Sequence, residues 1–289
     1  MVASEDKYIN PLTDFGFKKL FGSEPNKDLL IDFLNVIIPD RQVVDLSYSS
    51  NEHFGKSELD RKAVFDIYCI GENGERFIVE MQKAKQNFFK DRSVFYSSFP
   101  IQEQARKKEW DYQLDPVYSI GILDFVFDDH KDEQELFHLV ELKDQRCEVF
   151  YDKLKFVYIE LPKFKKAMSD LETHFEKWLY VFTHLSKLQD RPTELQERVF
   201  KKLFEVAELA KFSKEEREAY EESLKNYRDI KNVVDTAREE GREEGKEEGR
   251  ELGKQEQNIK IAKSLKQQGI SPEIIAQSTG LSSDDIEKL

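Results

Sequence analysis

The sequence predicts a mixed α/β (α+β) domain followed by a helical extension, and the distribution of proline and charged residues indicates both parts. Seven of the eight prolines fall at or before Pro192, where short runs of alternating apolar residues are interspersed with helical segments. Residues 193–256 contain no proline and are rich in Glu, Lys, Leu and Ala, a composition typical of helix. The expected divisions are a core over 1–165, a helical subdomain packed on it over 166–230, a Glu/Gly-repeat helix over 231–256 and a small helical tail over 257–289.

The expected core has the element order αβββαβ. A helix is expected where apolar residues recur at helical spacing in KDLLIDFLNVII, and Pro39 ends it. Strands are expected where apolar and polar residues alternate, because strand side chains point to opposite faces in turn. The expected elements are a helix over 27–38, strands over 43–49, 63–70 and 76–82, a helix over 91–108, strands over 117–126, 136–142 and 154–161, and helices from residue 170 onward.

Composition and charge exclude several classes of protein. No apolar run approaches the ~18 residues of a membrane span. The N-terminus lacks the pattern of a signal peptide, so a cytoplasmic protein is expected. Cys69 and Cys147 are far apart without a CxxC motif, which indicates neither a disulfide framework nor a thiolate zinc site, and the five histidines lack HxxxH or HExxH spacing. The net charge of −13 argues against indiscriminate nucleic-acid binding, but residues 83–110 have seven Lys or Arg against three Asp or Glu, which permits a local basic groove.

The most informative segment is the hairpin FDIYCIGENGERFIVEMQ, residues 65–82, because its loop length decides which side chains share a face. A two-residue Asn-Gly loop would place Asp66 and Glu80 on opposite faces. A three-residue loop with Gly74 in the left-handed conformation would pair them and place Gln82 beside them. The apolar pattern favours the three-residue loop, because register follows the buried face. That face would consist of Phe65, Ile67, Cys69, Phe77, Val79 and Met81.

In this register the Asp66 and Glu80 side chains would be about 5 Å apart at Cβ. Two carboxylates at that distance repel each other, and a hard divalent cation bound through oxygen atoms would neutralise them. The alternative is a solvated sheet face on which weak ion pairs with Arg76 compensate the charge. Ile70 and Ile78 flank the pair and indicate a partly covered face, which favours the cation.

The pattern of Asp followed by Glu-x-Gln across a hairpin, within αβββαβ, resembles the PD-(D/E)XK nuclease fold in the variant where Gln replaces the usual Lys. The surrounding segments are similar to the Rpn family of recombination-promoting nucleases, also called PD-(D/E)XK nuclease family transposases, over roughly residues 8–165. These segments are NPLTDFGFKKLFG (10–22), LLIDFLNVIIP (29–39), LDRKAVFDIYC (59–69), FIVEMQ (77–82), RSVFYSS (92–98), YQLDPVYSIGIL (112–123) and FVYIELPKF (156–164).

The resemblance implies a metal-dependent endonuclease that hydrolyses phosphodiester bonds of double-stranded DNA in recombination or transposition. Asp66 and Glu80, with the carbonyl of Met81, would hold Mg²⁺ or another divalent cation such as Mn²⁺ or Ca²⁺, which would activate a water. Gln82 stands where relatives have Lys; it can orient water or a phosphate oxygen but supplies no positive charge. Lys62 has the same strand parity as Asp66 and is either the missing cation or a solvated lysine at the strand edge.

Residues on two helices are further candidates for nucleic-acid contact or for support of the site. Asp14 and Lys18 are four residues apart and would share one helix face. Asp14 would reach the metal site, form a surface ion pair or cap the helix. Arg92, Tyr96 and Gln104 fall on the helix after the hairpin, where the superfamily places DNA-contacting or site-supporting side chains.

The last third of the sequence indicates an assembly element. Four glycines at 241, 245, 249 and 253 recur with a period of four within a Glu-rich helix, each at a cost of about 1 kcal/mol relative to Ala. The segment is either a solvated helical linker or a surface for close approach of a second copy. In the tail, Gly269 would end one helix, Ser271 and Pro272 would begin the next, and Ser282 would cap a third. IIAQSTGLSSDDI resembles a helix–turn–helix, but an assembly role is favoured over DNA reading.

Two other functions are compatible with the sequence. One is a non-catalytic DNA-binding relative in which Gln82 weakens metal binding. The other is an oligomerising scaffold built on the C-terminal helix. The basic segment 83–110 favours the two DNA-binding alternatives over the scaffold.

Overall fold

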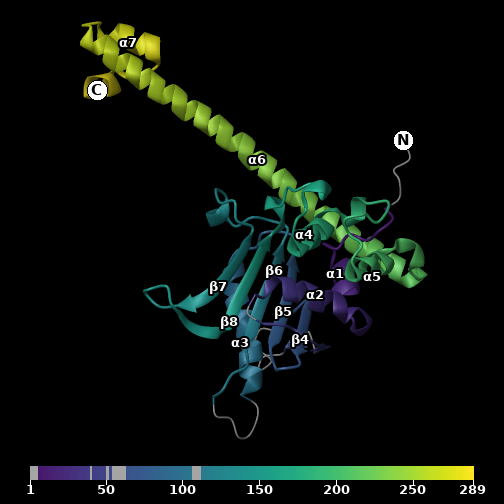
Figure 1. The fold of residues 1–289 in the computed structure, drawn as a ribbon. Helices are drawn as coiled ribbons and strands as arrows, with labels where there is room; N and C mark the ends of the chain where they lie inside the picture. Colours follow the sequence, from purple (N-terminus) through teal and green to yellow (C-terminus); the bar gives the residue numbers. More distant parts are fainter. Residues whose placement is uncertain (1–5, 40, 50–51, 54–62, 106–111) are drawn as a thin grey trace. The chain divides into compact units, whose positions relative to one another are not determined.

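A computed structural model of the chain describes residues 6–39, 41–49, 52–53, 63–105 and 112–289 (Figure 1). Its contacts divide it into two compact units, Met1–Lys231 and Asn232–Leu289. Within the described ranges no helix combines the length and the apolar character needed to cross a membrane.

The first unit is built on a six-stranded mixed sheet with the strand order β1-β4-β5-β6-β8-β7. The first three strands of this order are antiparallel, β5, β6 and β8 are parallel, and β7 is an antiparallel edge strand. β2 and β3 form a separate two-stranded ladder. The strands are β1 (Leu46–Tyr48), β2 (Glu52–His53), β3 (Ala63–Val64), β4 (Ile67–Gly71), β5 (Arg76–Gln82), β6 (Val117–Leu123), β7 (Phe137–Lys143) and β8 (Val149–Glu160).

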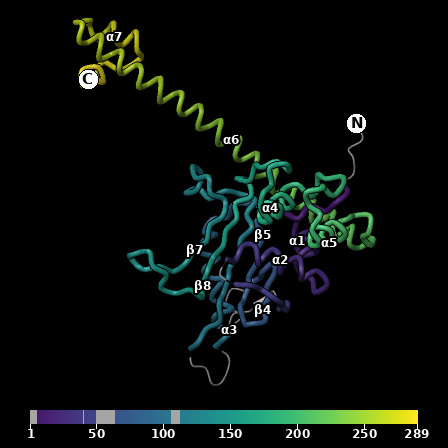
Figure 2. The backbone as a smooth tube through the Cα atoms, viewed as in Figure 1, coloured from purple at the N-terminus to yellow at the C-terminus, as the bar shows by residue number. Residues whose placement is uncertain are grey.

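Helices cover both faces of the sheet. The helices of this unit are α1 (Asp14–Phe21), α2 (Lys27–Ile37), α3 (Phe89–Gln104), α4 (His174–His184), α5 (Arg198–Ala207) and the beginning of α6 (Lys214–Gln267). α1, α2, α4 and α5 share the main hydrophobic core with one face of the sheet, while α3 packs on the other face (Figure 2). The predicted order αβββαβ is therefore confirmed, as α2-β1-β4-β5-α3-β6.

The register predicted for the β4–β5 hairpin is also confirmed. Ile67 pairs with Val79 and Cys69 with Phe77. The Gly71 N–H donates to the Glu75 carbonyl over 2.8 Å, which closes a three-residue loop. Gly74 has a φ of +88°, a conformation that L-residues with a side chain rarely adopt. Alternation along the strands then places Ile67, Cys69, Phe77, Val79 and Met81 in the main core, as predicted.

Phe65 departs from this prediction. It lies with Tyr68 and Ile78 on the opposite side of the sheet, where its ring packs on Tyr96 of α3 at 5.4 Å between centroids. The reason is a bend at Asp66, directly before β4 begins, so the two-residue alternation does not extend back to Phe65.

The second unit contains the remainder of α6 with α7 (Pro272–Thr279) and α8 (Ser283–Lys288), and it buries Ala262, Ile275 and Ile286 together. Gly269 has a φ of +79° after the end of α6, and the Ser282 hydroxyl accepts from the Asp285 N–H at 3.1 Å, so both predicted helix boundaries are confirmed. A Cβ added at any of the four α6 glycines would meet no described atom within 4 Å.

Candidate active site

The predicted carboxylate pair comes together where β4 begins and β5 ends. The Asp66 N–H donates to Glu80 Oε1 at 3.3 Å, and the Met81 N–H donates to Asp66 Oδ2 at 2.8 Å. Gln82 Nε2 donates to Glu80 Oε2 at 3.1 Å. The bend that moves Phe65 away is thus also the bend that brings the Asp66 carboxylate to the β5 backbone.

Both carboxylates are in an environment that disfavours their charge. Glu80 is only 8 % exposed, and burial followed by the charge of Asp66 holds the pKa of Glu80 well above its usual range. Burial also raises the pKa of Asp66. A proton or a cation therefore stabilises the pair. A cation bound there would have carboxylate oxygens of Asp66 and Glu80 as ligands.

Arg92 and Tyr96 of α3, two of the predicted site residues, lie beside Glu80. They line the same small cavity as Glu80, and the positive charge of Arg92 partly opposes the rise in the pKa of Glu80. The guanidinium carbon of Arg92 is 5.5 Å from the centre of the Tyr96 ring and 5.2 Å from that of Phe89. Aromatic contacts on both sides thus orient Arg92.

Asp14 and Lys18 form an ion pair of 2.9 Å on α1. Of the alternatives for Asp14, the surface ion pair is confirmed and the helix cap is wrong, because the Thr13 hydroxyl is the acceptor for the Gly16 N–H. Both charges nevertheless act on the active site: Lys18 lowers the pKa of Asp66 and Asp14 raises it. The pair is therefore close enough to affect Asp66 without touching it.

Lys83 was missed by the sequence analysis. It follows β5 directly and is partly buried, and this burial lowers its pKa, while Asp14 and Asp66 partly oppose the shift. Its ammonium forms no ion pair with a residue that the structure describes, whereas Lys18 is paired with Asp14. The available signal was a lysine next to the position where relatives have one, Gln82.

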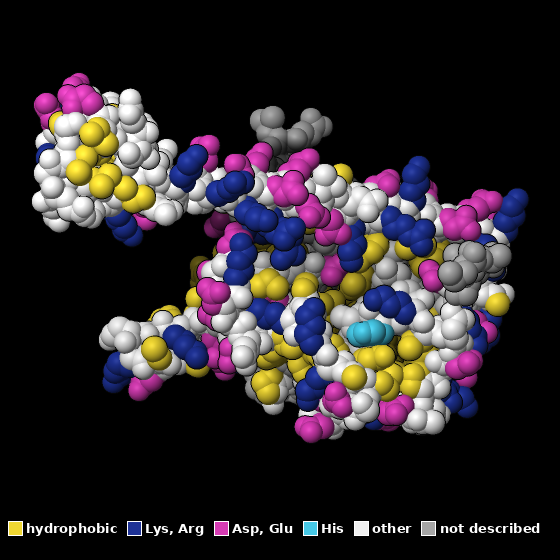
Figure 3. Space-filling view, turned by 90° about the horizontal axis from the view of Figure 1, so that it is seen from above, with side chains coloured by type: hydrophobic (Ala, Val, Ile, Leu, Met, Phe, Trp, Pro, Cys, Tyr) yellow, Lys and Arg dark blue, Asp and Glu magenta, His cyan; other side chains and the backbone are white. Residues whose placement is uncertain are grey.

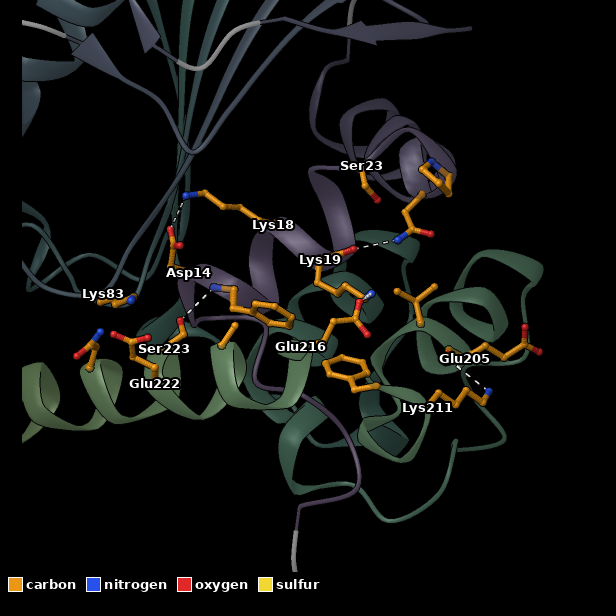
Figure 4. A pocket seen from close by; sticks show the side chains of 17 residues that line it. Asp14, Lys18, Lys19, Ser23, Lys83, Glu205, Lys211, Glu216, Glu222 and Ser223 are labelled. Carbon is orange, nitrogen blue, oxygen red and sulfur yellow. Dashed lines mark hydrogen bonds and ion pairs between the residues drawn. The ribbon is translucent and has the colours of Figure 1, made fainter. Parts of the chain in front are cut away.

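Lys83 lines a groove between α1, α5 and the beginning of α6, which Figure 4 shows from close by. Among the dashed lines there, one joins Lys18 to Asp14 and another joins Lys19 to Glu216. The charged residues of the groove are Lys18, Lys19, Lys83 and Lys211 with Asp14, Glu205, Glu216 and Glu222. Lys18, Lys19 and Lys211 are each paired with a carboxylate, so among the described residues Lys83 is the cation of this groove most available to an anion close to Asp66.

Two predicted site residues are not part of this arrangement. Gln104 lies at the far end of α3, where its amide oxygen accepts from the Asp115 N–H at 2.7 Å and its amide nitrogen donates to the Asp115 carbonyl at 3.3 Å. It links the end of α3 to Asp115, two residues before β6, and does not reach Glu80. Lys62 lies outside the described residues.

The donor set fits a hard divalent cation. Asp66 and Glu80 offer carboxylate oxygens, and Met81 adds a backbone carbonyl, which points to the same side of the strand as the N–H that bonds Asp66. Oxygen ligands of this type suit Mg²⁺, Mn²⁺ or Ca²⁺. No thiolate or imidazole is needed.

The sheet order and the buried Asp–Glu pair on the β4–β5 hairpin define the class of PD-(D/E)XK nucleases. Comparison with protein families matches residues 11–237 to the PD-(D/E)XK nuclease family transposases, and the chain belongs to this family. The Rpn resemblance of the sequence fits the same assignment. Comparison with curated proteins and with solved structures finds no match.

Proposed function

We propose that this chain is a divalent-metal-dependent endonuclease that hydrolyses phosphodiester bonds of double-stranded DNA in recombination or transposition. The observation that supports it most is the convergence of Asp66 and Glu80 in a buried position that disfavours two negative charges. Family membership supports a nuclease function of the transposition-related kind.

Each polar group of the site has a defined task in this proposal. Asp66, Glu80 and the Met81 carbonyl would hold the cation, which when bound supplies Lewis-acid polarisation of the phosphodiester and a more acidic water. Gln82 donates its amide N–H to Glu80, so its carbonyl oxygen is left to orient a water. Lys83 and Arg92 would bind phosphate oxygens and so supply the positive charge that Gln82 lacks.

Charge outside the site gives little help to DNA binding. On the face of the first unit shown in Figure 3, Lys and Arg side chains are interspersed with Asp and Glu. With a net charge of −13, the protein must bind phosphates through local groups, so DNA affinity should fall steeply with salt.

The test is a plasmid-nicking assay on the full chain with Mg²⁺, Mn²⁺ or excess chelator. Wild type should nick only with the cation, and Asp66→Asn should lose the activity. Glu72→Gln is the matched control, since it makes the same kind of change on the same hairpin at an exposed turn position. It should retain full activity.

One result would replace this proposal with a non-catalytic DNA-binding function. The wild-type chain would then bind duplex DNA at low salt without nicking it under any cation. The Gln82 amide bonded to Glu80 is the observation in favour of that alternative, because it stabilises the carboxylate without a metal. Absence of both binding and nicking would instead favour a scaffold built on α6.

A further inference from the structure

A second group of potential metal ligands lies at the β7 side of the sheet. His130 ends a 3-10 turn over Asp128–His130, His138 is the second residue of β7 and Glu160 is the last residue of β8. His130 Nδ1 is 3.3 Å from Glu160 Oε1, and His138 Nε2 is 3.2 Å from Glu160 Oε2. One donor atom from each of the three lies within 4.8 Å of the others.

The two short distances run to different oxygens of Glu160, so a single zinc ion is supported by the three donor atoms that lie within 4.8 Å of one another. With zinc–ligand bonds of about 2.0–2.1 Å, neighbouring ligand atoms of a tetrahedron are about 3.3 Å apart. The two imidazole rings are stacked at 4.2 Å between centroids and 28° between planes, so they approach the carboxylate side by side. The side chains of His130 and His138 are 18 % and 15 % exposed, which gives an ion access from solvent.

Glu160 is held in place by groups behind it. It is fully buried, and the Phe127 N–H donates to its Oε1 at 2.7 Å. Lys163 Nζ lies 2.7 Å from Oε2 and also donates to the Glu135 carbonyl at 2.8 Å. Hydrogen bonds of this kind orient the ligands of protein metal sites.

The sheet register separates this group from the candidate active site. Glu80 pairs with Gly121, Gly121 with Tyr158, and Tyr158 with His138. Three strand spacings amount to about 14 Å, whereas the ions of a two-metal nuclease site are about 4 Å apart. The Tyr158 side chain occupies the row between them, packed against Phe89 of α3. An ion at His138 therefore could not join in chemistry at Glu80.

We propose that His130, His138 and Glu160 bind a Zn²⁺ ion, with the fourth position open to water. Imidazole nitrogens favour zinc and disfavour Mg²⁺, in contrast to the all-oxygen set at Asp66 and Glu80.

The ion would connect the turn before β7, through His130, to the sheet strands that bear His138 and Glu160. Phe127, three residues before His130, packs on Phe89 at the start of α3 at 6.0 Å and on Tyr158 at 5.5 Å. The same turn is tied to the β5–α3 connection and to α3 by the ion pairs Lys85–Asp128 and Lys90–Asp129. Zinc would thus stabilise the end of α3 from which Arg92 projects.

The test is zinc binding by the full chain after chelator treatment and dialysis, measured by calorimetry. Wild type should bind one Zn²⁺, and Co²⁺ in its place should give the intense visible absorption of tetrahedral cobalt. His138→Gln and His130→Gln should each weaken zinc binding on the order of 100-fold, since even changes behind the ligands cost 10–100-fold.

His174→Gln is the matched control. His174 also contacts a carboxylate, Asp32, at 2.6 Å, but His174 belongs to no described cluster of three potential ligands. This variant, like Asp66→Asn, should bind one zinc with wild-type affinity, so the result does not depend on nuclease activity. Circular dichroism establishes that each variant is folded. If wild type binds no zinc, or if His138→Gln, His130→Gln and His174→Gln bind it equally, the proposal is wrong and the cluster is two histidines hydrogen-bonded to Glu160.

Discussion

A row of paired residues crosses the sheet from Glu80 on β5 to His138 on β7, and a buried carboxylate lies near each end of this row. The surroundings of these two carboxylates differ. At the β5 end, Glu80 faces a second carboxylate and a neutral amide, and its pKa is raised. At the β7 end, Glu160 is bonded by Lys163 and a backbone N–H and faces two imidazoles. The charge of Glu80 is only partly compensated, and its pKa is raised, whereas the pKa of Glu160 is lowered by Lys163, a backbone N–H and His138 before any metal binds.

This difference implies different ions and different roles. Two buried carboxylates that repel each other, close to the groove that Lys83 lines, suit a hard cation that takes part in phosphate chemistry. A compensated carboxylate with two imidazoles suits zinc, which here would connect a turn to the sheet.

The largest expected effect is that each variant loses one property and keeps the other: nicking depends on Asp66, and zinc binding depends on His138. Asp66→Asn should lower Mg²⁺-dependent nicking on the order of 100-fold or more, because it removes a proposed metal ligand and not only a group that orients one. Zinc binding should stay at one equivalent. His138→Gln should show the reverse, with zinc binding weakened on the order of 100-fold. Nicking should stay within about twofold when Mg²⁺ is in excess, because the packing of Phe127 on Phe89 still holds the start of α3. Parallel nicking and calorimetry on both proteins measure this pattern; loss of both properties by each of the two folded variants would show that the two groups do not act independently.

A smaller effect on zinc binding is expected at Lys163, which contacts Glu160. Lys163→Met removes the ammonium that orients this carboxylate and should weaken zinc binding about 10- to 100-fold. Lys165→Met is the control, because Lys165 is exposed and forms no ion pair with any residue in the described ranges. Equal zinc affinity of the two variants would mean that Lys163 does not position Glu160.

An effect of about tenfold is expected at Lys83. Lys83→Met should lower kcat/KM for nicking about tenfold, or about 1.4 kcal/mol, because a partly buried cation next to the carboxylate pair is lost. Lys19→Met alters the same groove at a lysine already paired with Glu216 and should have little effect. If both variants nick equally well, the positive charge at the site comes from elsewhere, and Arg92→Met is then the variant to measure.

The pH dependence of stability distinguishes the β5 end further. Because the pKa values of Glu80 and Asp66 are raised on folding, the metal-free folded chain holds protons that the unfolded chain has released. Stability from these groups therefore falls as pH rises above about 4.5, the region where an unperturbed Glu titrates. The melting temperature of wild type in chelator should thus fall more between about pH 5 and pH 7.5 than that of Asp66→Asn, and excess Mg²⁺ should reduce the difference. If the melting temperatures of the two proteins depend on pH in the same way, folding does not raise the pKa values of this pair.

The sequence predicted the β5 end far better than the β7 end, for a physical reason. Asp66, Glu80 and Gln82 lie on one hairpin, so the turn and the alternation of apolar residues sufficed to place them together. The same alternation failed for Phe65 because it stops at the Asp66 bend, and it gave no position for Lys83, which follows the strand. His130, His138 and Glu160 belong to three elements that only the parallel pairing of β6 with β8 and the return of β7 bring together. Local spacing contains no signal for such a cluster.

The smallest expected effect concerns the second unit, because both ends of the row lie within Met1–Lys231. A chain that ends at Asp235 should remain folded, bind one zinc and nick DNA within about twofold of the full chain, since the tail buries its apolar residues within itself. What should change is assembly: the glycine positions of α6 leave room for a second copy, and their loss should lower the number of chains per particle, measured as particle mass divided by chain mass in size-exclusion chromatography with light scattering. Unfolding of the shortened chain would place the end of the core beyond Asp235. A folded protein that no longer binds DNA at low salt would instead make the tail the DNA reader, and the carboxylate pair would then act only on DNA delivered by α7 and α8.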